Sequence, residues 1–129
     1  MSIEMKRLSS SKAKKMLEFL VQKRLGVKEA KLCFKPYFEH GPITLCTAYV
    51  TVTCDDGKGC DYPIIYQREY KSSGYGMSPV QQWGYSYAKL FRWMESRAER
   101  GYLFGIANAV VFSKGDTAES ALVEMDLCS

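Results

Sequence analysis

Apolar residues recur at helical spacing in two segments of the chain. In the first, serines at 9–11 can cap a helix and Gly26 can end it. In the second, Ser78 and Pro79 can open a helix that we expect to run to Arg100. One face of each helix collects the apolar positions: Ala13, Met16, Leu17, Leu20 and Val21 in the first, and Val80, Trp83, Gly84, Tyr87, Leu90, Phe91, Met94 and Ala98 in the second. The pattern therefore predicts two amphipathic helices.

Other segments have the composition or the alternation that is typical of strands. Pro36 and Pro63 favour a sheet edge or a bulge where they occur, because proline cannot donate to a ladder. Gly105 and Asn108 interrupt a very apolar run, which we interpret as a buried strand with a bulge. The predicted strands are residues 30–38, 43–54, 60–70, 102–112 and 119–127, the last because apolar and polar residues alternate there.

These elements follow the order α-β-β-β-α-β-β in one domain, residues 1–129. We expect an α+β fold in which a single antiparallel sheet of about five strands carries two amphipathic helices on one face. The composition also indicates a folded domain, because 47% hydrophobic and 13% aromatic residues are more than a disordered chain contains. No apolar run reaches the ~20 residues of a membrane-spanning helix, and the N-terminal segment does not resemble a secretory signal. We therefore expect a cytoplasmic protein that does not insert in membranes.

The net charge of +4 is unevenly distributed along the chain. Residues 1–31 hold nine Lys and Arg against three acids, a balance of +6, and residues 32–129 hold nine against eleven, a balance of −2. The last fifteen residues hold four acids and no Lys or Arg. The basic start favours a nucleic-acid partner, and the acidic end favours a protein partner because it repels phosphate.

The chemistry-bearing residues favour neither a metal site nor an enzyme. The five cysteines include no Cys-x-x-Cys pair, and the single His40 cannot complete a usual zinc set. Cysteines in a cytoplasmic protein are expected to be reduced thiols, although Cys54 and Cys60 flank a turn and could pair across it. Weaker possibilities are a magnesium site on Asp55, Asp56 and Asp61, and a nucleophile in which His40 acts with Cys33 or Cys46. We expect no cofactor, no metal and no catalysis.

A second stripe of the second helix is the main candidate for binding. It interleaves aromatic, cationic and polar side chains on the face opposite the core, namely Tyr85, Lys89, Arg92, Trp93, Ser96 and Arg100. Cations neutralise phosphates or carboxylates, and Tyr and Trp stack on bases or anchor a protein partner. A loop at 71–77 that includes Lys71 and Tyr75 is the second candidate. The alternative for Trp93 is that it packs against another segment of the chain.

The order of the first five predicted elements resembles that of double-stranded-RNA-binding domains. The second helix of those domains begins with lysines, whereas here no lysine occurs in it before Lys89. Residues 50–92 are distantly similar to phage single-strand annealing proteins. That similarity consists of an Asp-Gly turn and a few helix residues: Asp56, Gly57, Gln82, Gly84, Tyr87, Ala88 and Lys89. These short matches assign the chain to no family.

We interpret the sequence as a small non-catalytic binding protein that docks onto a protein partner. It would act as an inhibitor or adaptor of the kind that viruses and mobile elements encode. The alternative is a nucleic-acid-binding protein that uses the same helix face, and an enzyme is the third interpretation. The oligomeric state is left open: a homodimer is possible, because the last predicted strand has no proline to discourage pairing with a second chain.

Overall fold

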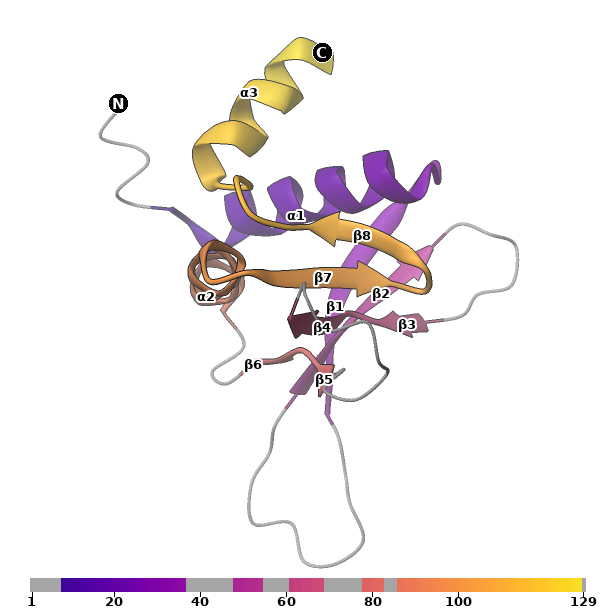
Figure 1. Cartoon of the computed structure of the whole chain (residues 1–129). Coiled ribbons are helices and arrows are strands. Elements are labelled where there is room, and N and C mark those ends of the chain that lie inside the picture. Colours follow the sequence, from indigo (N-terminus) through magenta and orange to yellow (C-terminus); the bar gives the residue numbers. More distant parts are fainter. Residues whose placement is uncertain (1–7, 37–47, 55–60, 69–77, 83–85, 129) are drawn as a thin grey trace, which may run out of the picture.

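The computed structural model describes residues 8–36, 48–54, 61–68, 78–82 and 86–128, which form three helices and eight short strands (Figure 1). The α+β class is therefore as predicted. Two antiparallel sheets form in place of the single sheet of about five strands. Within these ranges no helix is long and apolar enough to cross a membrane.

The first helix, α1 (Ser10–Leu25), forms where the sequence predicts it. The Ser9 side chain accepts a hydrogen bond from the Lys12 backbone N–H, and Gly26 ends the helix in the left-handed conformation (φ 73°). The five residues that the periodicity places on the apolar face are the buried ones. The capping residues and the apolar period therefore predict both ends and the buried face of α1.

The second helix, α2 (Tyr87–Glu99), begins later than predicted. Its N-cap is Ser86, whose hydroxyl accepts a hydrogen bond from the Lys89 N–H. The residues expected in its first turns instead form the short strands β5 (Ser78–Pro79) and β6 (Gln81–Gln82). Val80 lies between these strands and is fully buried, and its N–H and C=O bond the backbone of Ile64 and Val50. Tertiary pairing of a buried segment has overridden a local capping signal.

The first sheet, sheet 1, is built around β2. Its order is β1 (Ala30–Pro36), β2 (Ala48–Cys54) and β3 (Asp61–Pro63), and β6 also pairs with β2. The second sheet, sheet 2, has the order β5, β4 (Ile65–Arg68), β7 (Tyr102–Ile106) and β8 (Ala109–Phe112). Pro63 lies in the edge strand β3, where its missing N–H breaks no ladder.

A ring of three backbone hydrogen bonds joins the two sheets. The Val50 N–H donates to Val80 O (2.9 Å), the Val80 N–H to Ile64 O (2.7 Å) and the Ile64 N–H to Val50 O (3.0 Å). All three side chains are at most 1% exposed. The predicted strand at 60–70 therefore divides at Ile64, where the chain leaves β2 and joins sheet 2.

Residues 102–112 form a hairpin rather than one bulged strand. Ala107, which has a positive φ of 55°, and Asn108 make the turn between β7 and β8. The predicted irregularity is present as a register shift between Phe104 and Gly105. A Cβ atom on Gly105 would lie 3.0 Å from the Ala109 carbonyl oxygen, so glycine permits this close approach.

The predicted strand at 119–127 is wrong, because this segment is a third helix, α3 (Ala118–Cys128). Thr117 and Ser120 cap it reciprocally: each hydroxyl accepts a hydrogen bond from the other residue's N–H (3.0 and 2.9 Å). The Glu95 carboxylate of α2 accepts a further bond from the Ala118 N–H (2.8 Å). The residues that α3 turns inward follow helical spacing: Ala118, Ala121, Leu122 and Met125. The expected pairing of a second chain with a terminal strand therefore loses its basis.

The core lies where α1 and α2 meet the sheets. α1 packs against α2, β1 and β8, α2 packs against β7, and α3 packs on α1 (Figure 1). Phe112 makes edge-to-face contacts with Phe91 (5.6 Å between centroids) and with Phe104 (5.8 Å). This aromatic cluster fixes α2 against sheet 2 and so positions the outer face of α2.

Candidate functional site

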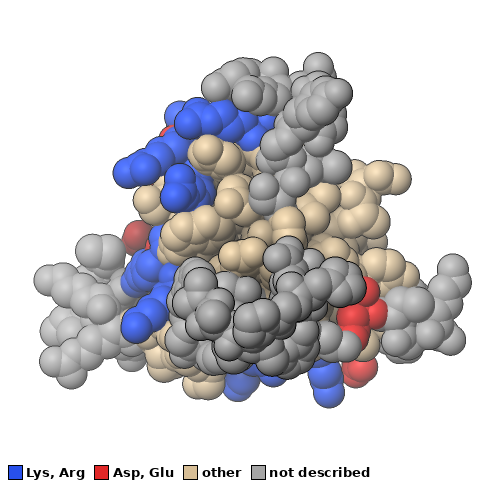
Figure 2. All heavy atoms as spheres, turned by 90° about the horizontal axis from the view of Figure 1, so that it is seen from below, with Lys and Arg blue, Asp and Glu red and all other residues tan. Residues whose placement is uncertain are grey.

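The outer face of α2 carries the predicted binding residues that the structure describes. Lys89, Arg92, Ser96 and Arg100 are all exposed on it. Figure 2 shows several Lys and Arg side chains following one side of the molecule, the side on which α2 lies in Figure 1. The other predicted residues, Tyr85, Lys71 and Tyr75, lie outside the described residues.

Trp93 is half-buried, so the expectation of an exposed tryptophan is corrected. Its ring meets Tyr66 of β4 edge-on (5.3 Å between centroids) and Phe104 of β7 edge-on (5.7 Å). The alternative that Trp93 packs against another segment is therefore what the structure shows.

Two arginines that the sequence analysis did not select lie on these aromatic rings. The Arg97 guanidinium carbon is 5.6 Å from the Trp93 ring centroid and 5.8 Å from that of Tyr102. The Arg68 guanidinium carbon is 4.9 Å from the Tyr102 centroid. These distances are within the range of cation–π attraction. Spacing of four residues between Trp93 and Arg97 could have revealed the first pair, whereas the second depends on the register that places Arg68 opposite Tyr102.

We define the α2 surface as Lys89, Arg92, Trp93, Ser96, Arg97 and Arg100 of the helix region together with Arg68 and Tyr102 of sheet 2. Its cations are Lys89, Arg92, Arg97, Arg100 and Arg68, and the carboxylates in α2 are Glu95 and Glu99. Among the described residues, these five positive charges against two negative charges leave +3. The surface therefore attracts anionic groups over a range set by ionic strength.

Arg92 has a structural role in addition to its charge. Its guanidinium forms an ion pair with Glu95 (2.8 Å), and Glu95 also accepts the Ala118 N–H bond that begins α3. A change at Arg92 would therefore disturb the contact between α2 and α3. Lys89 and Arg100 are better positions for testing the charge of the α2 surface.

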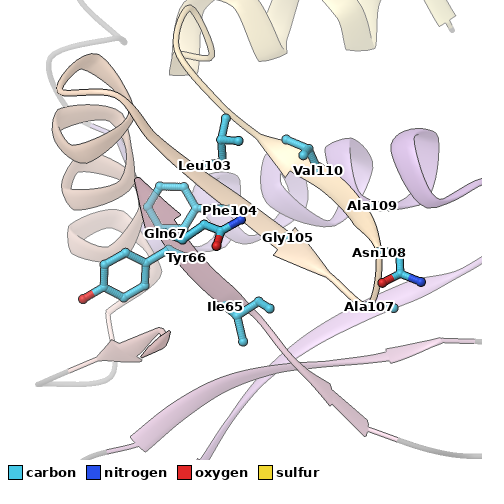
Figure 3. Close-up of a pocket in the computed structure, with 10 residues that line it drawn as sticks. All are labelled: Ile65, Tyr66, Gln67, Leu103, Phe104, Gly105, Ala107, Asn108, Ala109 and Val110. Carbon is cyan, nitrogen blue, oxygen red and sulfur yellow. The ribbon is translucent and has the colours of Figure 1, made fainter. Parts of the chain in front are cut away.

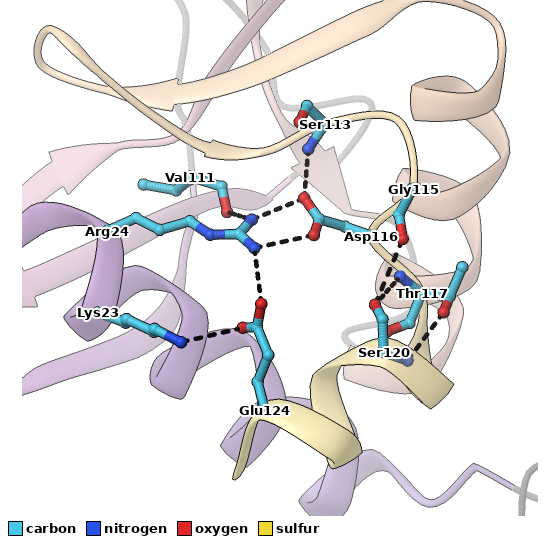
Figure 4. A network of polar contacts seen from close by, with 9 residues as sticks. All are labelled: Lys23, Arg24, Val111, Ser113, Gly115, Asp116, Thr117, Ser120 and Glu124. Carbon is cyan, nitrogen blue, oxygen red and sulfur yellow. Dashed lines mark hydrogen bonds and ion pairs between the residues drawn. The ribbon is translucent and has the colours of Figure 1, made fainter. Parts of the chain in front are cut away.

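The basic first helix is partly neutralised within the fold. Arg24 makes a two-point contact with Asp116 (2.6 and 2.9 Å), donates to Val111 O (3.0 Å) and lies 3.5 Å from Glu124 (Figure 4). The hydrogen bonds and charges of Asp116 and Glu124 raise the pKa of Arg24, with the Asp116 hydrogen bond as the main cause. Lys23 lies 3.9 Å from Glu124. The acidic end of the chain thus folds back on the basic start, and the charge asymmetry of the sequence is reduced on this side of the molecule.

Tyr87 and Glu18 cover the outer edge of sheet 1. The Glu18 carboxylate accepts a bond from the Leu32 N–H (2.9 Å), and the Tyr87 hydroxyl donates to Leu32 O (3.1 Å). The Tyr87 ring also stacks on Phe34 (4.3 Å between centroids). Burial raises the pKa of Tyr87 to about 12, and negative charge at Cys33 and Glu18 adds to the shift. These bonds occupy β1 where a second chain would have to pair.

A hollow of about 250 Å³ lies on the outer face of sheet 2 (Figure 3). Apolar side chains of Ile65, Leu103 and Val110 and the amides of Gln67 and Asn108 surround it, with Gly105 among them. None of the described residues that line it is a carboxylate, imidazole, thiol or lysine. Among the described lining residues the phenol of Tyr66 is the one titratable group.

Most of the residues that the sequence offers for metal binding or catalysis lie in segments that the structure does not describe. His40, Cys46, Asp55, Asp56 and Cys60 lie outside the described residues, so their proposed roles and the Cys54–Cys60 pairing remain predictions. Asp61 accepts a hydrogen bond from the Thr53 hydroxyl. Among the residues described, no three His, Cys, Asp or Glu side chains are grouped as a metal site.

Comparisons with protein-family models, with curated proteins and with solved structures found no match for this chain.

Proposed function

We propose that this chain is a non-catalytic binding protein that docks through the α2 surface onto an acidic surface of another protein. The observation that carries the proposal is the guanidinium of Arg97 resting on the Trp93 and Tyr102 rings within a surface of net charge +3. Arginine supported by aromatic residues is typical of the centres of protein interfaces. The protein would act in the cytoplasm as an inhibitor or adaptor.

Protein docking is favoured over base recognition by the way the aromatic rings are used. Edge contacts with Tyr66 and Phe104 fix Trp93, and the guanidinium of Arg97 lies over it. A nucleic-acid base would need to displace that guanidinium before it could stack. A carboxylate needs no such rearrangement, because it binds the N–H groups of the arginine.

Nucleic acid is the second candidate because the same cations can neutralise phosphates. Such binding would use Lys89, Arg97 and Arg100 without base stacking. It would therefore show little sequence preference and would weaken steeply with salt.

Charge reversal at Lys89 and Arg100 tests the proposal. Both side chains are exposed on the α2 surface, so Lys89→Glu with Arg100→Glu should leave the fold intact. Lys114→Glu is a matched control, because Lys114 is exposed in the turn before α3. We expect a partner captured from the native host by the unchanged protein to be retained by Lys114→Glu and lost by the double variant.

Two results would count against the proposal. Equal capture of the partner by the double variant would show that another surface is used. Capture that depends entirely on nucleic acid, and disappears after nuclease treatment, would favour the second candidate.

A further inference from the structure

The Arg97 side chain rests on two aromatic rings that are packed against the core. Trp93 is fixed by edge contacts with Tyr66 and with the fully buried Phe104. Tyr102 lies against Tyr66 (5.7 Å between centroids) and carries Arg68 as well as Arg97. The guanidinium of Arg97 is therefore supported by a platform that the fold holds in one place.

A cation–π contact does not use the N–H donors of a guanidinium, so those of Arg97 can still form hydrogen bonds. The Arg97 guanidinium carbon is 5.6 Å from the Trp93 ring centroid and 5.8 Å from that of Tyr102, and the five N–H donors of a guanidinium lie in the plane of the group. Among the described residues, no carboxylate forms an ion pair with Arg97. Arg24 and Arg92, in contrast, are paired with carboxylates of their own chain. Arg97 thus combines a fixed position with an unused fork of donors.

The charges around Arg97 suit an acidic partner. Lys89 and Arg100 are exposed on the same surface, and Arg68 lies over the Tyr102 ring. They raise the local potential and attract a negatively charged patch before contact is made. The rings beneath Arg97 exclude water from one side of the group, which strengthens a hydrogen-bonded ion pair formed on the other side.

We propose that Arg97 is the anchor of the α2 surface and that its two parallel N–H groups bind an Asp or Glu carboxylate of the protein partner. This inference rests on the proposed function and names the partner group that the α2 surface recognises. Planar two-point pairing of this kind requires arginine, because lysine provides only a point charge.

The test compares two substitutions that keep the charge, using poly-L-glutamate as the probe. Arg97→Lys keeps the charge and removes the planar fork of N–H donors, and Arg100→Lys makes the same chemical change at an exposed neighbour. The fluorescence of Trp93, measured in a Trp83→Phe background, reports binding beside its own ring. We expect Arg97→Lys to weaken binding about tenfold and Arg100→Lys to weaken it less than about twofold.

Tyr102→Leu provides a second variant in which both arginines remain. It removes the ring under Arg97 and should weaken binding of poly-L-glutamate in the same direction as Arg97→Lys. Circular dichroism melting of each variant shows whether the fold is kept. Agreement between the two variants would support the anchor through independent changes.

The contrary outcomes can be told apart. Equal losses in Arg97→Lys and Arg100→Lys would overturn the anchor and leave the proposed function standing. Tighter binding of oligothymidylate than of poly-L-glutamate at the same salt concentration would show that the α2 surface prefers phosphate to carboxylate. That result would overturn the inference. Binding of neither probe at low salt would overturn the inference and the proposed function together.

Discussion

At the scale of residues, side chains bond backbone groups at one place in each of the edge strands β1 and β8. Glu18 and Tyr87 bond both backbone groups of Leu32, and Arg24 bonds the carbonyl of Val111 in β8. A backbone group that already has a partner offers less to an incoming strand. An incoming strand would therefore find the backbone groups of Leu32 and the carbonyl of Val111 already bonded.

Tyr87 gives a prediction on pH. Its pKa is raised to about 12 in the folded chain, against about 10 in an unfolded chain. The folded state thus holds the phenol proton more tightly, so the resulting stabilisation is complete below pH ~10 and is lost as the pH rises towards 12. We expect Tyr87→Phe to remove one late step from the titration of tyrosinate absorbance. A step near the ordinary tyrosine pKa that disappears in this variant would contradict the burial of Tyr87.

Gly105 gives a prediction on stability. Its substitution by alanine would place a Cβ atom 3.0 Å from the backbone oxygen of Ala109, where the hairpin must move to relieve the contact. We expect Gly105→Ala to lower the free energy of unfolding by roughly 1–3 kcal/mol, measured by urea denaturation. An unchanged midpoint would show that the β7–β8 bulge adapts without cost.

At the scale of elements, the sequence predicts those whose signals are local. α1 has an N-cap, a glycine stop and a clear apolar period, and it forms as predicted. In α3, alternation at Ala121, Val123, Met125 and Leu127 suggests a strand, although Val123 and Leu127 are exposed. The Thr117–Ser120 capping pair was the missed local signal for that helix.

The caps of α3 lead to a test. Ser120→Ala removes the oxygen that accepts the Thr117 N–H, together with the hydroxyl that lies within donating distance of the carbonyl oxygens of Gly115 and Thr117. We expect a loss of about 1 kcal/mol in the free energy of unfolding. Ser96→Ala is the control, because Ser96 is exposed within α2 and caps no helix. Equal effects of the two substitutions would mean that the cap contributes nothing of its own.

At the scale of the whole molecule, long-range pairing decides what the sequence could not show. The division into two sheets depends on the bonds among Val50, Ile64 and Val80, which are far apart in sequence. The same applies to the α2 surface: the cationic stripe is visible in the sequence, but Arg68 joins it only through its register with Tyr102. The charge distribution also depends on long-range contacts, because the acidic residues near the C-terminal end neutralise part of the basic first helix only in the folded chain.

The network at Arg24 connects three elements and gives a prediction for α3. Asp116→Asn removes the negative charge from the contact with Arg24 and weakens a bond that holds the turn before α3. We expect faster amide hydrogen exchange throughout α3 while α2 keeps its protection. Exchange that rises equally in both helices would instead indicate general destabilisation.

The central claim, that the α2 surface is where an acidic protein docks, is tested most directly by mapping the footprint of a bound acidic chain. Amide hydrogen exchange, followed by mass spectrometry with and without saturating poly-L-glutamate, would locate it. We expect added protection in residues 87–100 and in the neighbouring ends of β4 and β7, with no change in α1 or α3. Protection centred on α1, or on the hollow of sheet 2, would contradict it.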